Sequence, residues 1–279
     1  MHPPALTEAQ YDLHAVREQL EADGYAVLRN VIDPATHLDP IWHAIRQIAR
    51  LIADNKRLPH DIGDADSLAS FQCEALRLAR VDRSFLSALY DASKQIPAFL
   101  RLACSSLFED IYSAVRNTSL VGIGTSSYGI RFDLPDEDKF RSHWHQEFAF
   151  NPQSTTGLVF WVPLVQMHAT IGAVEICRGS HRLGPIPHAR LERFANKRGI
   201  YQVGIPDDET IVGRFETICP LTAPGDLVLM DFATLHQSGH NRSSDLRVTM
   251  QVRLFDFHAA DGAAASWPSD PNTVFGYGV

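Results

Sequence analysis

The order of apolar and polar residues divides the chain into a helical first part and a strand-rich second part. Residues 8–23 carry a helical pattern that ends at the stop signal Asp23-Gly24, and residues 40–58 repeat apolar residues at helical spacing. Residues 84–115 contain at least one more helix, and the apolar run 25–32 predicts an early strand. We therefore expect a mainly helical N-terminal part.

From Leu120 onward, short runs of β-branched and aromatic residues alternate with Gly, Pro, Asp and Asn. The predicted strands are 128–132, 157–162, 172–176, 227–230 and 247–255. This spacing favours an antiparallel sandwich or barrel. Because the helices precede the strands, we expect one α+β domain with helices packed on one face of the β core. Residues 185–208 resemble an insertion or lid, and the Gly- and Ala-rich tail 261–279 is expected to be extended.

Composition and charge exclude several classes of protein. The 279 residues are 45% hydrophobic and 21% charged, which suits a globular protein, and we assign residues 1–279 to a single domain. The net charge of −8, without a basic block, argues against a nucleic-acid partner. The first residues lack the pattern of a secretory signal, and no apolar run approaches the ~20 residues that span a bilayer. We expect a cytoplasmic protein without a membrane partner, whose oligomeric state the sequence does not reveal.

The segment 141–150 contains the residues that point most directly to chemistry. On an extended chain, His145 and Glu147 point to the same face, so both can enter one pocket. A third ligand is offered by His236, which follows a Pro-Gly-Asp turn and an apolar strand. Two His and one carboxylate leave three metal positions open, the arrangement of non-haem Fe(II) oxygenases. Taken alone, His145 and Glu147 also fit a surface pair on a strand.

Two arginines are candidates for holding a second ligand. Arg247 lies eleven residues after His236, where its guanidinium can grip a carboxylate with two hydrogen bonds. A metal with such an arginine beside it explains how 2-oxoglutarate would be held. Arg131, on the predicted strand 128–132, is a candidate contact to the keto acid or the substrate. Both arginines also fit structural ion pairs. His143 shares the alternation of His145 and is either a pocket residue or purely structural.

Together these pieces resemble the phytanoyl-CoA dioxygenase-like Fe(II)/2-oxoglutarate oxygenases, from about residue 20 to 255. The matching pieces are Trp144–Glu147, Trp161–Leu164, Gly172–His181, Pro224–Asp226, and His236-x-Ser-Gly followed by Arg247. The resemblance implies a double-stranded β-helix, the jelly-roll barrel that cupins share. It also implies metal ligands at His145, Glu147 and His236, and a keto-acid anchor at Arg247 assisted by Ser238.

One position departs from the family pattern. The family usually has Asp where this chain has Glu147, whose side chain is one methylene longer. Glutamate keeps the charge and the oxygen donors, so we expect a working metal site.

The resemblance further implies a dioxygenase that uses Fe(II), 2-oxoglutarate and O2 to hydroxylate a carbon of a small-molecule substrate, releasing succinate and CO2. Two other functions fit the residues. One is a cupin-like metal enzyme that uses no keto acid, and the other is a degenerate barrel that serves as a binding protein. The sequence does not identify the substrate.

Overall fold

The N-terminal part of the protein is helical, with one early strand. A computed structural model describes residues 11–63, 67–124, 128–151, 154–197 and 199–259. The helices are α1 (Leu13–Asp23), α2 (Asp39–Asn55), α3 (Leu68–Val81), α4 (Ser84–Ser93), α5 (Pro97–Ala103) and α6 (Ser106–Arg116). The strand β1 (Tyr25–Leu28) follows α1, and a short π-helical turn (Pro34–Leu38) precedes α2.

Local signals explain where these helices begin and end. Asp12 caps α1 by accepting a hydrogen bond from the backbone N–H of Ala15, and Gly24 ends the helix with a left-handed φ of 77°. The segment 84–115, predicted to contain at least one helix, folds into three, because Pro97 starts α5 and Ser105 precedes α6 in extended conformation. Helix α3 was not predicted.

Two antiparallel sheets form the β core. The strands are β2 (Val121–Ile123), β3 (Gly129–Asp133), β4 (Leu158–Pro163), β5 (Val174–Cys177), β6 (Ala189–Arg190), β7 (Val203–Gly204), β8 (Thr217–Ile218), β9 (Leu227–Asp231), β10 (His236–Ser238) and β11 (Arg247–Asp256). The larger sheet has the order β1-β9-β4-β11-β2, and β3 also pairs with β11. The smaller sheet has the order β10-β5-β8, and β6 pairs with β7 separately.

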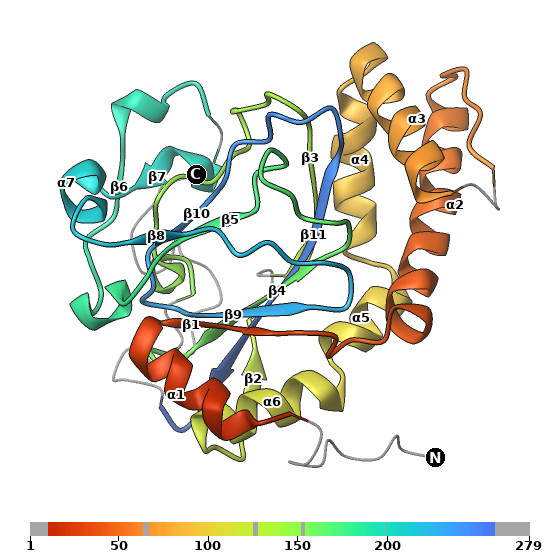
Figure 1. Cartoon of the computed structure of the whole chain (residues 1–279). Coiled ribbons are helices and arrows are strands. Elements are labelled where there is room, and N and C mark those ends of the chain that lie inside the picture. The colour runs from red at the N-terminus through yellow and green to blue at the C-terminus, as the bar shows by residue number, and fades with distance from the viewer. Residues whose placement is uncertain (1–10, 64–66, 125–127, 152–153, 198, 260–279) are drawn as a thin grey trace.

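The helices cover the outer face of the larger sheet (Figure 1). Helices α1, α4 and α6 contact β1, β3 and β2, respectively, and the ring of Phe108 in α6 lies 5.0 Å from that of Phe160 in β4. All six residues of β4 are buried, because Phe160 faces the helices while Val159 and Trp161 face the opposite side. The expected α+β double-stranded β-helix, with helices on one face, is confirmed.

The expected lid, residues 185–208, folds around the β6-β7 hairpin and is followed by α7 (Asp208–Val212). We call residues 185–208 the cap segment. Within the described ranges, no helix combines the length and apolar character needed to cross a membrane. The predicted tail 261–279 lies outside the described residues, and the assignment of residues 1–279 to one domain stays a prediction.

Candidate functional site

A cavity of about 460 Å³ lies between the two sheets. The larger sheet lines it through β3, β4, β9 and β11, and the smaller sheet through β5 and β10. Strand β11 supplies every second side chain from Arg247 onward, because alternate residues of a strand share a face. These inward-facing residues are Arg247, Thr249, Gln251 and Arg253. The three predicted metal ligands line the same cavity.

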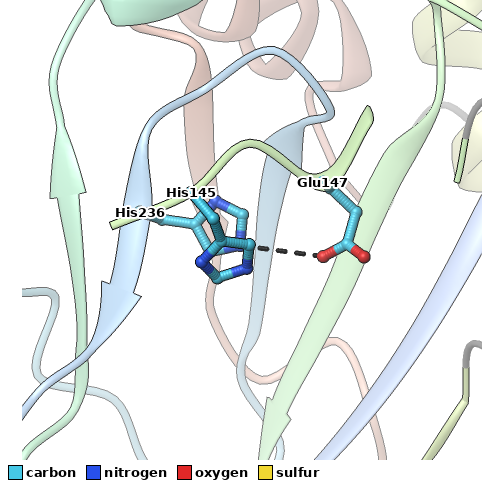
Figure 2. Close-up of side chains that lie close together, drawn as sticks. All are labelled: His145, Glu147 and His236. Carbon is cyan, nitrogen blue, oxygen red and sulfur yellow. Dashed lines mark ion pairs between the residues drawn. The ribbon is translucent and has the colours of Figure 1, made fainter. Parts of the chain in front are cut away.

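The backbone brings His145 and His236 together. Each of the two residues donates its N–H to the carbonyl of the other at 3.0 Å, which forms an isolated antiparallel bridge. The centroids of the two imidazole rings lie 4.3 Å apart, and Figure 2 shows the two rings side by side. The segment was predicted to be extended through Glu147, but that residue instead begins a 3-10 turn, Glu147–Ala149. Its carboxylate nevertheless faces the two imidazoles, as the prediction required.

Backbone carbonyls orient both imidazoles. Nδ1 of His145 lies 2.6 Å from the carbonyl oxygen of His143, and Nδ1 of His236 lies 2.9 Å from that of Thr234. Since a carbonyl only accepts, each Nδ1 carries the hydrogen, and each Nε2 presents a lone pair. Nε2 of His236 lies 3.7 Å from Oε2 of Glu147.

One metal ion fits between these three residues. Their ligand atoms all lie within 4.8 Å of one another. A six-coordinate ion with bonds of about 2.1 Å places adjacent donors about 3 Å apart, so modest side-chain adjustments suffice. Glu147 is 2% exposed and His236 5%, so few waters compete with such an ion.

The charges of the three residues also suit a metal. Burial, and then the neighbouring His236, lower the pKa of His145 to about 3, so this imidazole is neutral near pH 7. Burial alone would raise the pKa of Glu147, but Arg253 and the two imidazoles outweigh it and hold that pKa below its usual range. Neutral imidazoles and an ionised carboxylate are the forms that bind metals.

Arg247 lies in the same cavity with most of its donors already engaged. Its Nε and Nη2 lie 3.2 and 3.1 Å from Oδ2 of Asp133. Its Nη1 donates to the carbonyls of Gly239, at 2.8 Å, and Gly172. Of its five N–H groups, one on Nη2 thus has no partner within the described part of the chain. Arg247 was expected from the sequence to hold a carboxylate with two hydrogen bonds. It can do so only if Asp133 releases one of the Arg247 N–H groups that it now accepts.

Asp133 lies between the two predicted anchor arginines. Its Oδ1 accepts from Nη2 of Arg131 at 2.7 Å. Burial raises the pKa of Asp133, but Arg131 and Arg247 outweigh this and lower the pKa to about 2. The two guanidinium groups and one carboxylate therefore carry a net charge of +1. From the sequence, Arg131 was either a contact to the keto acid or substrate or part of a structural ion pair. In the structure it forms a buried ion pair and also lines the cavity.

Ser238 lies close to this cluster through Ser142. The backbone N–H of Ser238 donates to the carbonyl of Ser142 at 3.0 Å, and Arg131 donates to the hydroxyl of Ser142 at 3.0 Å. Ser238 also lines the cavity. The structure thus brings together Arg131, Arg247 and Ser238, the residues predicted to hold a keto acid.

His143, predicted to be either a pocket residue or purely structural, contacts the cap segment. His143 lines the cavity and stacks on Phe194 of the cap segment, with ring centroids 3.8 Å apart. Burial and the nearby Lys197 lower the pKa of His143 to about 4.

Sequence reasoning missed three residues that contact the predicted site. Arg253 and Asn151 both donate to the carboxylate of Glu147, and Asp133 bridges the two arginines. Counting every second residue from Arg247 would have found Arg253. Asn151 lies four residues after Glu147, but only the turn at Glu147 makes that spacing meaningful.

Comparisons with known proteins agree with this arrangement. The sequence pattern of the family described as phytanoyl-CoA dioxygenase (PhyH) matches residues 20–249. A 1-deoxypentalenic acid 11-beta-hydroxylase of Streptomyces exfoliatus is 28% identical over 137 residues, 47% of this chain and 48% of that protein. A protein of the same name from Streptomyces arenae is 29% identical over 137 residues. The chain thus matches about half the length of these curated relatives.

Solved structures share the fold at low sequence identity. The epimerase SnoN, in complex with Fe3+, alpha ketoglutarate and nogalamycin RO, has a TM-score of 0.58 at 16% identity, over 88% of this chain and 84% of that one. EctD from S. alaskensis with bound Fe has a TM-score of 0.56 at 16% identity, over 93% and 80%. With the family pattern matched over most of its length, the chain belongs to the phytanoyl-CoA dioxygenase family.

Proposed function

We propose that the protein is an Fe(II)- and 2-oxoglutarate-dependent dioxygenase that hydroxylates an unactivated carbon of a small molecule. The observation that carries this proposal is one cavity that contains both a His-Glu-His cluster and an arginine cluster of net charge +1. Family membership supports it, as do the curated hydroxylases and the solved structures that hold Fe and alpha ketoglutarate.

In this proposal, His145, Glu147 and His236 hold the iron. The donor set fits, because the structure offers two imidazole Nε2 atoms and an ionised carboxylate around one point. When bound, Fe(II) with 2-oxoglutarate and O2 supplies the oxidation of a C–H bond, coupled to release of succinate and CO2. The protein fixes both imidazoles through the carbonyls of His143 and Thr234.

Arg247 receives the distal carboxylate of 2-oxoglutarate in this proposal, with Ser238 beside it. A dianion suits the cluster, because its net charge of +1 is buried and charge-assisted hydrogen bonds are strong there. Asp133 holds the Arg247 guanidinium, and Arg131 in turn pairs with Asp133. The keto acid would accept a hydrogen bond from the Nη2 N–H of Arg247 that has no partner among the described residues. It would compete with Asp133 for the N–H groups that Asp133 now accepts.

The substrate would occupy the rest of the cavity, where aromatic and apolar side chains lie beside polar ones such as Gln237 and Gln251. Its walls there include Tyr90, Tyr128, Phe150, Val159, Tyr201 and Met230. A volume of about 460 Å³ suits a small organic molecule once the keto acid is bound. The cap segment contributes Tyr201 and Val203 and would shield the reacting carbon from water. A cytoplasmic location remains part of this proposal.

The proposal is tested by the turnover of 2-oxoglutarate. The protein is loaded with Fe(II) without oxygen, mixed with 2-oxoglutarate and O2, and assayed for succinate. We expect succinate only with iron and keto acid present, and none from a folded His236→Ala variant. Iron binding without any consumption of 2-oxoglutarate would favour a metal enzyme of another kind. The absence of stoichiometric iron would favour a binding protein.

A further inference from the structure

Glu147 has two close partners besides the imidazoles. Oε1 accepts a hydrogen bond from Nδ2 of Asn151 at 2.6 Å, and Oε2 accepts one from Nη2 of Arg253 at 3.0 Å. The side chain of Glu147 is 3% exposed, so these donors replace water around a buried charge. Each carboxylate oxygen is thereby held from a different side.

Asn151 reaches Glu147 because the chain turns there. The backbone N–H of Asn151 donates to the carbonyl of Glu147 at 2.9 Å, an i to i+4 contact. In such a turn the side chains of these two residues lie on the same side. A regular strand would have carried Asn151 about 13 Å away along the chain. The turn that replaces the predicted strand therefore creates the contact.

Arg253 reaches Glu147 from the larger sheet. It lies on β11 opposite Val159 of β4, and its Nη2 also lies 2.9 Å from Oε1 of Gln251. Gln251 thus steadies the guanidinium that contacts Glu147. These contacts come from β11, which pairs with β2, β3 and β4 within the larger sheet.

We propose that Asn151 and Arg253 are positioning residues that hold the longer carboxylate of Glu147 in the orientation a metal requires. The inference rests on the proposed function, in which Glu147 is a ligand. Glutamate has one more rotatable bond than aspartate, and a fixed carboxylate is needed beside the two imidazoles. Two donors on different oxygens remove that freedom. An aspartate, shorter by about 1.5 Å, would reach neither donor at hydrogen-bonding distance.

The test measures binding of Co(II) alone to the full chain, without keto acid, by the d–d absorption of the bound ion. Loss of a hydrogen-bond partner of a metal ligand typically weakens binding by about 10–100-fold. We expect Asn151→Ala and Arg253→Lys each to weaken Co(II) binding in this range; lysine keeps the charge but loses the planar fork. In a Glu147→Asp background, the same substitutions should change affinity by less than about threefold.

A matched control separates positioning from folding. Asn241 is also a buried asparagine, and its amide donates to the carbonyls of Asp133 and Asp245. Asn241→Ala should therefore leave Co(II) affinity within about threefold of wild type even if it lowers stability.

The outcomes distinguish the two proposals. Equal Co(II) binding by His236→Ala and wild type would overturn the metal site itself. If His236→Ala abolishes binding while Asn151→Ala and Arg253→Lys bind like wild type, only the positioning role is wrong. Equal losses in the Glu147 and Asp backgrounds would also contradict that role, because the effect would then not pass through the carboxylate.

Discussion

Replacing Asp133 by asparagine tests whether the arginine cluster is held together by one buried charge. Asp133→Asn keeps the shape of the side chain but leaves Arg131 and Arg247 as two neighbouring cations without their shared carboxylate. The pKa of Asp133 is about 2, against an ordinary 3.8, and at about 1.4 kcal/mol per pH unit the difference amounts to roughly 2–3 kcal/mol. Removing one partner of a buried ion pair costs about 3–5 kcal/mol. We therefore expect Asp133→Asn to lower the free energy of unfolding by about 3 kcal/mol.

The loss is measured as the change in Tm, followed by circular dichroism. For a chain of this size, about 2–4 °C accompany each kcal/mol, so Tm should fall by about 6–12 °C at pH 7. Asp91, whose side chain is 76% exposed beside Lys94, provides the control, and Asp91→Asn should change Tm by less than about 2 °C. Co(II) affinity should not change in Asp133→Asn, since Asp133 lies outside the ligand cluster.

The pH dependence gives a second check with a defined sign. The folded pKa of Asp133 is depressed, so its contribution is fully present above the unfolded value near 4 and disappears as the pH falls toward 2. The Tm gap between wild type and Asp133→Asn should narrow over that interval. A gap below about 2 °C at pH 7, or one that stays constant down to pH 2, would refute the argument.

Substitutions at three further residues test other parts of the molecule. Arg247→Met should raise the apparent 2-oxoglutarate constant about thirtyfold or more, the equivalent of at least about 2 kcal/mol, and a change below about threefold would point to another anchor. Glu147→Asp should retain iron and measurable succinate formation, whereas Glu147→Gln should bind iron far more weakly; full iron affinity with lost turnover would indicate proton transfer instead. Lys197, 3% exposed, donates to the carboxylate of Asp138 at 2.9 Å, so Lys197→Met should speed limited proteolysis of the cap segment without changing iron affinity. Unchanged proteolysis would show that this contact does not hold the cap.

The grouping of the three candidate metal ligands was predictable because their signals are local. His145 and Glu147 are two residues apart, and His236 follows an apolar strand behind a Pro-Gly-Asp turn. The predicted shared pocket forms even though Glu147 begins a turn, since the side chains of His145 and Glu147 both face the cavity. Helix α3 could have been predicted too, because Ser67 caps it and apolar residues recur at helical spacing.

The contact of Asp133 with Arg247 was not predictable, because it depends on strand register. Asp133 meets Arg247 only because β3 pairs with β11 with these two residues opposite each other. They are separated by 114 positions in sequence, and neither local pattern refers to the other. For the same reason, the sequence could not reveal that most donors of Arg247 are already engaged. Tyr90 likewise reaches the cavity from α4 through tertiary packing alone.

The central claim is that one iron bound by His145, Glu147 and His236 chelates 2-oxoglutarate in this cavity. Titration of the oxygen-free Fe(II) protein with 2-oxoglutarate, followed by ultraviolet-visible absorption, tests it most directly. We expect a weak charge-transfer band in the visible that saturates at one keto acid per iron and is absent in His236→Ala. Iron bound at one equivalent with no such band at saturating 2-oxoglutarate would contradict it.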